Sequence, residues 1–247
     1  MKLHLGNAPF THKDRADDHY YQGRHFPAEL HYNDFIIHFH GWYNHIDSVN
    51  SYFQLEKQFL SARKNAILSI PQGPKNAPDS FGGKLSEQGG LERFLTELTD
   101  SLIARKVLRS HKPGNIILTG HSGGYSPIAY ILMHGGLRNH IMEVQLYDGI
   151  YSHLEKYVWW IRNQEARFFY IMTENGGTKI LHRQLADSLR ACGLLFLEMQ
   201  EANLSIETAA QNKIILCHSN LGNNEVLHQQ ENYRKLIAAS ILKPLKD

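Results

Sequence analysis

Cysteine is scarce in this sequence: the 247 residues contain only Cys192 and Cys217. Two cysteines cannot build a disulfide framework, which excludes the small secreted folds held together by several bridges. The chain also lacks an apolar run long enough to span a bilayer, and its first residues, MKLHLGNAPFTHKDRADD, contain no apolar signal-peptide core. We therefore expect a cytoplasmic protein without a signal peptide and without stable membrane insertion.

The sequence also lacks a strong net charge of either sign. The formal net charge is +2, from 26 Lys and Arg against 24 Asp and Glu. This balance gives no electrostatic reason to expect nucleic acid or an acidic membrane as a partner, so a small-molecule or acyl substrate is expected. Histidine, in contrast, is abundant at 16 residues, which favours catalysis, metal binding or a response to pH.

Short β-branched or aromatic runs alternate with amphipathic helical patterns along the chain. DFIIHFHGW at 34–42, NAILSIP at 65–71 and RFFYIMT at 167–173 read as buried strands. This order predicts an α/β fold with a mostly parallel central sheet and helices on both faces. We expect one domain over residues 1–247, with residues 1–32 irregular or forming edge strands. One helix is expected at 47–65 and a last helix at 229–242.

The stretch NIILTGHSGGYSPIAYILMHGG at 115–136 contains the motif G-x-S-x-G, formed by Gly120, Ser122 and Gly124. A strand pattern precedes it and a helical pattern follows it directly. In this setting a sharp turn projects the serine side chain, and glycines are required where the strand and helix approach closely. Ser122 is therefore predicted to be a nucleophile, the alternative being a tight turn with an idle serine.

A serine hydroxyl needs a base, and the base needs an orienting acid, in the chain order Ser, acid, His for this type of turn. Asp148 in LYDGIY is the preferred acid, and Glu174 remains the alternative. His228 is the preferred base because it precedes the last predicted helix, with His218 as the alternative. His182 is expected on the solvent-exposed face of a helix.

The turn HFHGW at 38–42 follows an early strand and can aim a backbone N–H at a developing negative charge. With the residue after the nucleophile, it predicts an oxyanion hole formed by the amides of Trp42 and Gly123. His38 and His40, with His45 and Asp47 nearby, also resemble part of a metallohydrolase site. No further residue has ligand-like spacing, so the prediction includes no metal and no cofactor, and His38 or His40 is expected to brace the oxyanion turn.

Together, HFHGW, GHSGG, LYDGIY and a late histidine resemble the α/β-hydrolase superfamily of serine esterases, lipases and peptidases. The resemblance covers roughly residues 33–245 and is specific to no subfamily. It implies an enzyme that cleaves an ester, thioester or amide through an acyl-enzyme intermediate. Two features depart from the commonest pattern: the acid comes one strand early, and the short stretch between Asp148 and the next strand leaves room for a minimal lid or none. A non-catalytic binding protein on the same fold is the other alternative.

Overall fold

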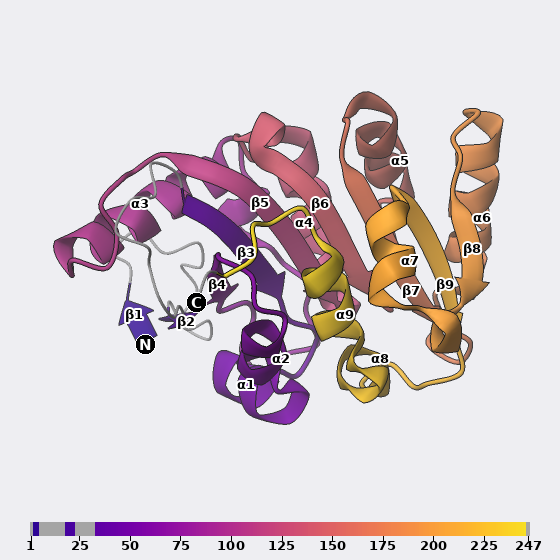
Figure 1. Ribbon diagram of the computed structural model, residues 1–247, viewed down its shortest axis with the longest axis horizontal. Helices are drawn as coiled ribbons and strands as arrows, with labels where there is room; N and C mark the ends of the chain where they lie inside the picture. Colours follow the sequence, from indigo (N-terminus) through magenta and orange to yellow (C-terminus); the bar gives the residue numbers. More distant parts are fainter. Residues whose placement is uncertain (1, 5–17, 23–32, 246–247) are drawn as a thin grey trace.

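The computed structural model describes residues 2–4, 18–22 and 33–245, which form a twisted sheet between two layers of helices (Figure 1). The strands are β1 (Lys2–His4), β2 (Asp18–Gln22), β3 (Asn33–Phe39), β4 (Ile67–Pro71), β5 (Pro113–His121), β6 (Ile141–Tyr147), β7 (Arg167–Thr173), β8 (Leu197–Gln200) and β9 (Ile214–Ser219). The helices are α1 (Ile46–Phe53), α2 (Leu55–Ser61), α3 (Gly90–Ala104), α4 (Tyr125–His134), α5 (Leu154–Asn163), α6 (Lys179–Ala191), α7 (Ile206–Gln211), α8 (Glu225–His228) and α9 (Asn232–Ala239).

The strand order is β1-β2-β4-β3-β5-β6-β7-β9-β8. The pairs β1–β2 and β2–β4 are antiparallel, and every pair from β4 across the sheet to β8 is parallel. The prediction of a mostly parallel sheet is confirmed. The two strands that fall within residues 1–32 lie at one outer edge, and the rest of that segment lies outside the described residues.

Alternate side chains of the parallel strands belong to two separate apolar layers, one on each face of the sheet. Phe35 and Ile37 of β3 face α3, α4, α5 and α6, whereas Ile36 faces α1, α2, α7, α8 and α9. This two-residue alternation, with both faces covered, explains why the strands read as continuous apolar runs. Helices on both faces of the sheet are therefore confirmed.

Two predicted helix boundaries were wrong. The helix expected at 47–65 is two helices, because Gln54 adopts a left-handed backbone at φ 52°. Phe53 and Leu55 are both buried, and two positions apart on one continuous helix they would point in nearly opposite directions, so the break places both in the core. The last helix begins at Asn232, later than expected, because Gln230 and Glu231 also have positive φ, and it ends at Ala239.

Between β6 and β7 the only regular element is α5, which packs on the core through the buried side chains of Tyr157, Trp160 and Ile161. The prediction of a minimal lid is confirmed. None of the described helices has the length and apolar character needed to cross a membrane.

Candidate active site

Ser122 lies where β5 ends and a single turn, Ser122–Gly124, leads into α4. Its φ is +49°, a left-handed conformation that costs a non-glycine residue about 1–2 kcal/mol. The flanking glycines permit the turn: a Cβ on Gly124 would lie 2.2 Å from the Phe39 carbonyl oxygen, and one on Gly120 would lie 2.7 Å from Ile128 Cδ1. The close approach inferred from the motif is therefore present.

The turn after β3 is packed against the same serine. A Cβ on Gly41 would lie 2.8 Å from the Ser122 Cβ, so only glycine fits without a shift. His40 braces this turn: its Nε2 accepts a hydrogen bond from the Gly73 amide (2.9 Å), and its Nδ1 donates to the Gly41 carbonyl (2.8 Å). Burial is the main factor that lowers the pKa of His40, to about 4, so the ring is neutral at pH 7 as this pairing requires.

The two predicted oxyanion donors lie beside the nucleophile. The Trp42 ring covers Gly123, since a Cβ on Gly123 would lie 2.7 Å from Trp42 Cδ1. Trp42 Nε1 donates a 2.7 Å hydrogen bond to the Ser80 hydroxyl, which holds the half-exposed indole in place. Trp42 and Ser122 line the same cavity, and the role of the Trp42 and Gly123 amides as an oxyanion hole stays a prediction.

A cavity of about 590 Å³ opens over Ser122. Its walls combine aromatic rings with small polar groups, as substrate pockets usually do. They consist of Gly41, Trp42, Tyr43, Asn44, His45, Ser48, Tyr52, Phe53, Asn76, His121, Ser122, Asn223 and Asn224.

Asp148 follows β6 directly, is fully buried, and has a left-handed backbone at φ 46°. Its Oδ1 accepts hydrogen bonds from the Thr173 amide (3.1 Å) and the Thr178 hydroxyl (2.7 Å). Its Oδ2 accepts from the Asn223 amide group (2.7 Å) and the Tyr151 hydroxyl (3.3 Å). Four donors around one carboxylate fix its position.

The alternative acid, Glu174, points elsewhere. Its carboxylate pairs with Lys179, which is the main factor lowering its pKa, and lies 3.7 Å from His218 Nδ1. The structure therefore brings Asp148 towards the Ser122 cavity and directs Glu174 to the β9 edge of the sheet.

Neither predicted base contacts the nucleophile. His228 ends the short helix α8, where its Nδ1 donates to the Asn224 carbonyl (3.1 Å). Its ring packs on Tyr52 and Phe53, with ring centroids 5.2 and 5.9 Å away. His218 forms a 2.9 Å contact with Glu198 on the next strand. Within residues 33–245, no hydrogen bond joins a histidine to Ser122 or Asp148.

Asn223 and Tyr151 are site residues that the sequence patterns did not reveal. Asn223 contacts Asp148, and its backbone carbonyl accepts a 2.7 Å hydrogen bond from His121 Nε2. Burial and Asp148 raise the pKa of the Tyr151 phenol, and a hydrogen bond with Ser122 opposes the rise. The only available signal was position, because both residues follow strands whose carboxyl ends meet near Ser122.

His38 and His40 are engaged in hydrogen bonds with neighbouring groups, although Nε2 of His38 has no partner in the described part of the chain. Both nitrogens of His40 are engaged in bracing the turn, and His38 Nδ1 pairs with the Thr119 hydroxyl at 2.8 Å. Among the described residues, the grouping of three potential ligands that does occur contains neither of them. The bracing role expected for one of this pair is present at His40.

No protein-family model matches the sequence, and a search of curated proteins finds no match. Solved structures with the same fold include S-formylglutathione hydrolase (FrmB) from Staphylococcus aureus, at TM-score 0.56 and 10% identity, covering 86% of this chain and 84% of that one. FphF, a fluorophosphonate-binding serine hydrolase of Staphylococcus aureus, matches at TM-score 0.57 and 8% identity over 97% of both chains. Mycobacterium tuberculosis MPT51 (FbpC1) matches at TM-score 0.54 and 12% identity, covering 90% of this chain and 92% of that one. The chain has the α/β-hydrolase fold.

Proposed function

We propose that this protein is a serine hydrolase that cleaves a carboxylic ester, thioester or amide, with Ser122 as the nucleophile. The observation that carries the proposal is the left-handed backbone of Ser122 at the end of β5, facing a cavity of about 590 Å³. Backbone strain of this kind is retained mainly at functional sites, and the strand–turn–helix setting is that of a nucleophile elbow. The names of similarly folded proteins, an S-formylglutathione hydrolase and a ferulic acid esterase, support ester or thioester substrates.

In the proposed reaction, Ser122 Oγ attacks the substrate carbonyl carbon as its proton passes to the base. The amides of Trp42 and Gly123 stabilise the resulting oxyanion. The tetrahedral intermediate then expels the alcohol, thiol or amine, which takes the proton from the base. Water, activated by the same base, releases the acyl group and regenerates Ser122.

His228 is our proposed base, oriented by Asp148. His228 now bonds the Asn224 carbonyl and packs on Phe53, so its imidazole must leave these contacts to approach Ser122. Asn223 must also leave Asp148 for the imidazole to take its place. Catalytic contacts are often completed only when substrate binds, and the proposal requires such a step here.

A second candidate function, binding without turnover, is favoured by one observation. Asn223 is the partner of Asp148 at 2.7 Å, and a carboxamide cannot accept the proton of a serine hydroxyl. In that case the cavity would hold an acyl compound without cleaving it.

Labelling with a fluorophosphonate probe tests the first candidate. We expect the wild-type protein to be labelled, Ser122→Ala to be unlabelled, and the matched control Ser126→Ala, one turn along on α4, to be labelled as the wild type is. His228→Gln should slow labelling about 100-fold or more if His228 is the base. Labelling that persists in Ser122→Ala rejects the nucleophile assignment, and an unlabelled wild type that still binds a carboxylic ester supports the second candidate.

A further inference from the structure

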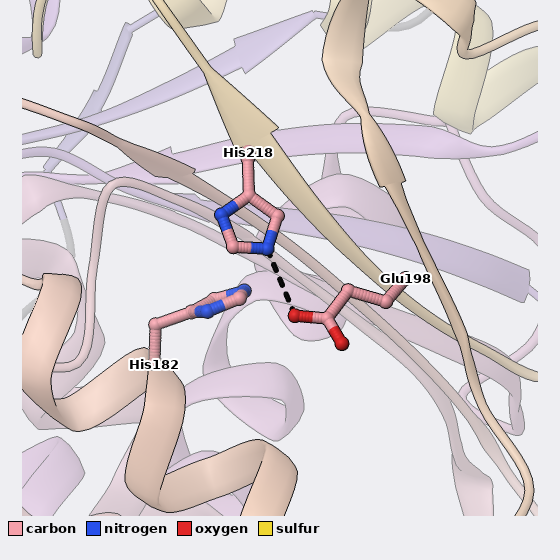
Figure 2. Close-up of side chains that lie close together, drawn as sticks. All are labelled: His182, Glu198 and His218. Atoms are coloured by element: carbon pink, nitrogen blue, oxygen red, sulfur yellow. Dashed lines mark hydrogen bonds and ion pairs between the residues drawn. The ribbon is translucent and has the colours of Figure 1, made fainter.

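Three side chains from separate elements converge at the β8–β9 edge of the sheet, away from Ser122. They are His182 of α6, Glu198 of β8 and His218 of β9 (Figure 2). One nitrogen or oxygen atom from each lies within 4.8 Å of the others. β6 and β7 separate this edge from β5, which carries Ser122.

His182 is the anomaly at this edge. The sequence predicted a solvated surface residue, which is wrong: the side chain is fully buried, and neither ring nitrogen has a hydrogen-bond partner. Its ring packs against the Tyr170 ring. It also lies edge-on to the His218 ring, and the centroids of the two imidazoles are 4.5 Å apart. Buried polar atoms without partners are rare in proteins because each costs free energy. The two nitrogens of His182 are therefore candidates to bind a ligand.

The ring chemistry suits a metal ion. An imidazole nitrogen is a preferred ligand of zinc and related ions.

The other two residues are already oriented as ligands. His218 Nε2 lies 2.9 Å from Glu198 Oε1, and the opposite nitrogen, Nδ1, faces Glu174 at 3.7 Å. A carboxylate behind a histidine is the usual support of a metal-binding ring. The second oxygen of Glu198 accepts a hydrogen bond from Arg190 (2.8 Å), which holds that carboxylate towards the cluster.

We propose that His182, Glu198 and His218 bind one divalent zinc-class ion. Two imidazole nitrogens and one carboxylate oxygen match the ligand preference of zinc and are too nitrogen-rich for calcium or magnesium. Water completes a four-coordinate shell. The side chains of His218 and Glu198 are 24% and 35% exposed, which gives the ion a route in from solvent. The bound ion joins α6 to β8 and β9, so it stabilises the folded state.

Zinc binding to the full chain, after removal of metals with a chelator, tests this site. We expect one zinc ion per chain with micromolar or tighter affinity, a higher melting temperature with zinc, and a cobalt spectrum typical of four-coordination. Glu198→Gln, which changes a half-exposed side chain, and His182→Ala should each weaken binding by about 100-fold or more. His111→Ala, at a 65% exposed side chain elsewhere, is the matched control and should bind as the wild type does.

Two results would overturn the site: a wild-type protein that takes up no zinc from a micromolar solution, or unchanged affinity in both Glu198→Gln and His182→Ala. If His182→Ala fails to fold, Glu198→Gln alone decides, because its side chain lies at the solvent boundary. Neither result depends on the activity proposed for Ser122.

Discussion

The side chain of Asn223, a residue of the Ser122 cavity wall, donates a 2.7 Å hydrogen bond to Oδ2 of the buried Asp148. In a serine hydrolase the acid makes this contact with the histidine that serves as base. Here the chain order is preserved, with Ser122, Asp148 and a late polar residue, but that residue is an amide. The rate of the proposed reaction should therefore depend on Asn223.

Replacing Asn223 with histidine should create the missing contact. An imidazole at this position can bond Asp148 through one nitrogen and face Ser122 with the other. We expect Asn223→His to raise the hydrolysis rate of a chromogenic acetate ester by about 100-fold or more, the usual contribution of a positioned base. Asn224→His, beside it in the same cavity wall, is the control. An unchanged rate in a folded Asn223→His protein would show that the position is not that of a base.

Asp148→Asn should distinguish the two predicted acids. The carboxamide NH₂ group would replace one acceptor oxygen and would face groups that themselves donate hydrogen bonds. The present donors to Asp148 are Thr178, Asn223, Tyr151 and the Thr173 amide. We expect a loss of about 2 kcal/mol in the free energy of unfolding, measured in urea, together with reduced esterase activity. Glu174→Gln, which weakens a partly exposed ion pair with Lys179 and a 3.7 Å contact with His218, should change neither by much. The reverse ranking of the two variants would make Glu174 the acid.

The serine that the proposed activity requires at position 122 should lower the stability of the fold. Its φ of +49° is unfavourable for any residue with a Cβ and acceptable for glycine. We expect Ser122→Gly to unfold with a free energy about 1 kcal/mol higher than that of Ser122→Ala, although both lose the hydroxyl. Urea denaturation of the two variants measures this difference. Equal stabilities would mean that the turn relaxes when the hydroxyl is removed.

His40 should make the protein sensitive to acid. Its folded-state pKa, about 4, lies below the unfolded value of 6.5, so between these values the unfolded chain binds more protons. The resulting stability is present above pH 6.5 and is lost as pH falls towards 4, by about 3 kcal/mol in total. His38 and His121, whose pKa values are also lowered by burial, add to the loss.

The unfolding free energy, measured from pH 7 to pH 4, tests the contribution of His40. His40→Gln should be less stable than the wild type at pH 7 and should lose less stability on acidification. His111→Gln, at an exposed histidine, is the control and should follow the wild-type slope. A slope unaffected by His40→Gln would show that this ring is not the group that titrates.

The fold was accessible from the sequence because its signals are local. Phe35, Ile36 and Ile37 are consecutive apolar residues whose side chains alternate between the two faces of the sheet, and such a run indicates a strand covered on both faces. The elbow was accessible for the same reason, since Gly120, Ser122 and Gly124 lie within five positions. Helix ends were harder to predict, because the break at Gln54 is set by burial of Phe53 and Leu55 in a distant core.

The partners of Ser122 could not be predicted in the same way. Asn223 contacts Asp148 although 75 positions separate them in the sequence, and no sequence periodicity predicts such a contact. His228 has the expected chain order but belongs to α8, whose buried residues Val226 and Leu227 set the direction of its ring. His182 was assigned to the surface because it is a polar residue on a helix, although its position is on the buried face, three and four residues before Leu185 and Ala186.

The flat packing of α5 on the core has a consequence for kinetics. Lipases whose sites are capped by a mobile lid become active at an oil–water surface, where the lid opens. With Tyr157 and Trp160 of α5 anchored in the core, no such cap lies between β6 and β7. Turnover of a dissolved ester should then follow simple saturation, with no jump in rate when the substrate concentration passes the point at which micelles form.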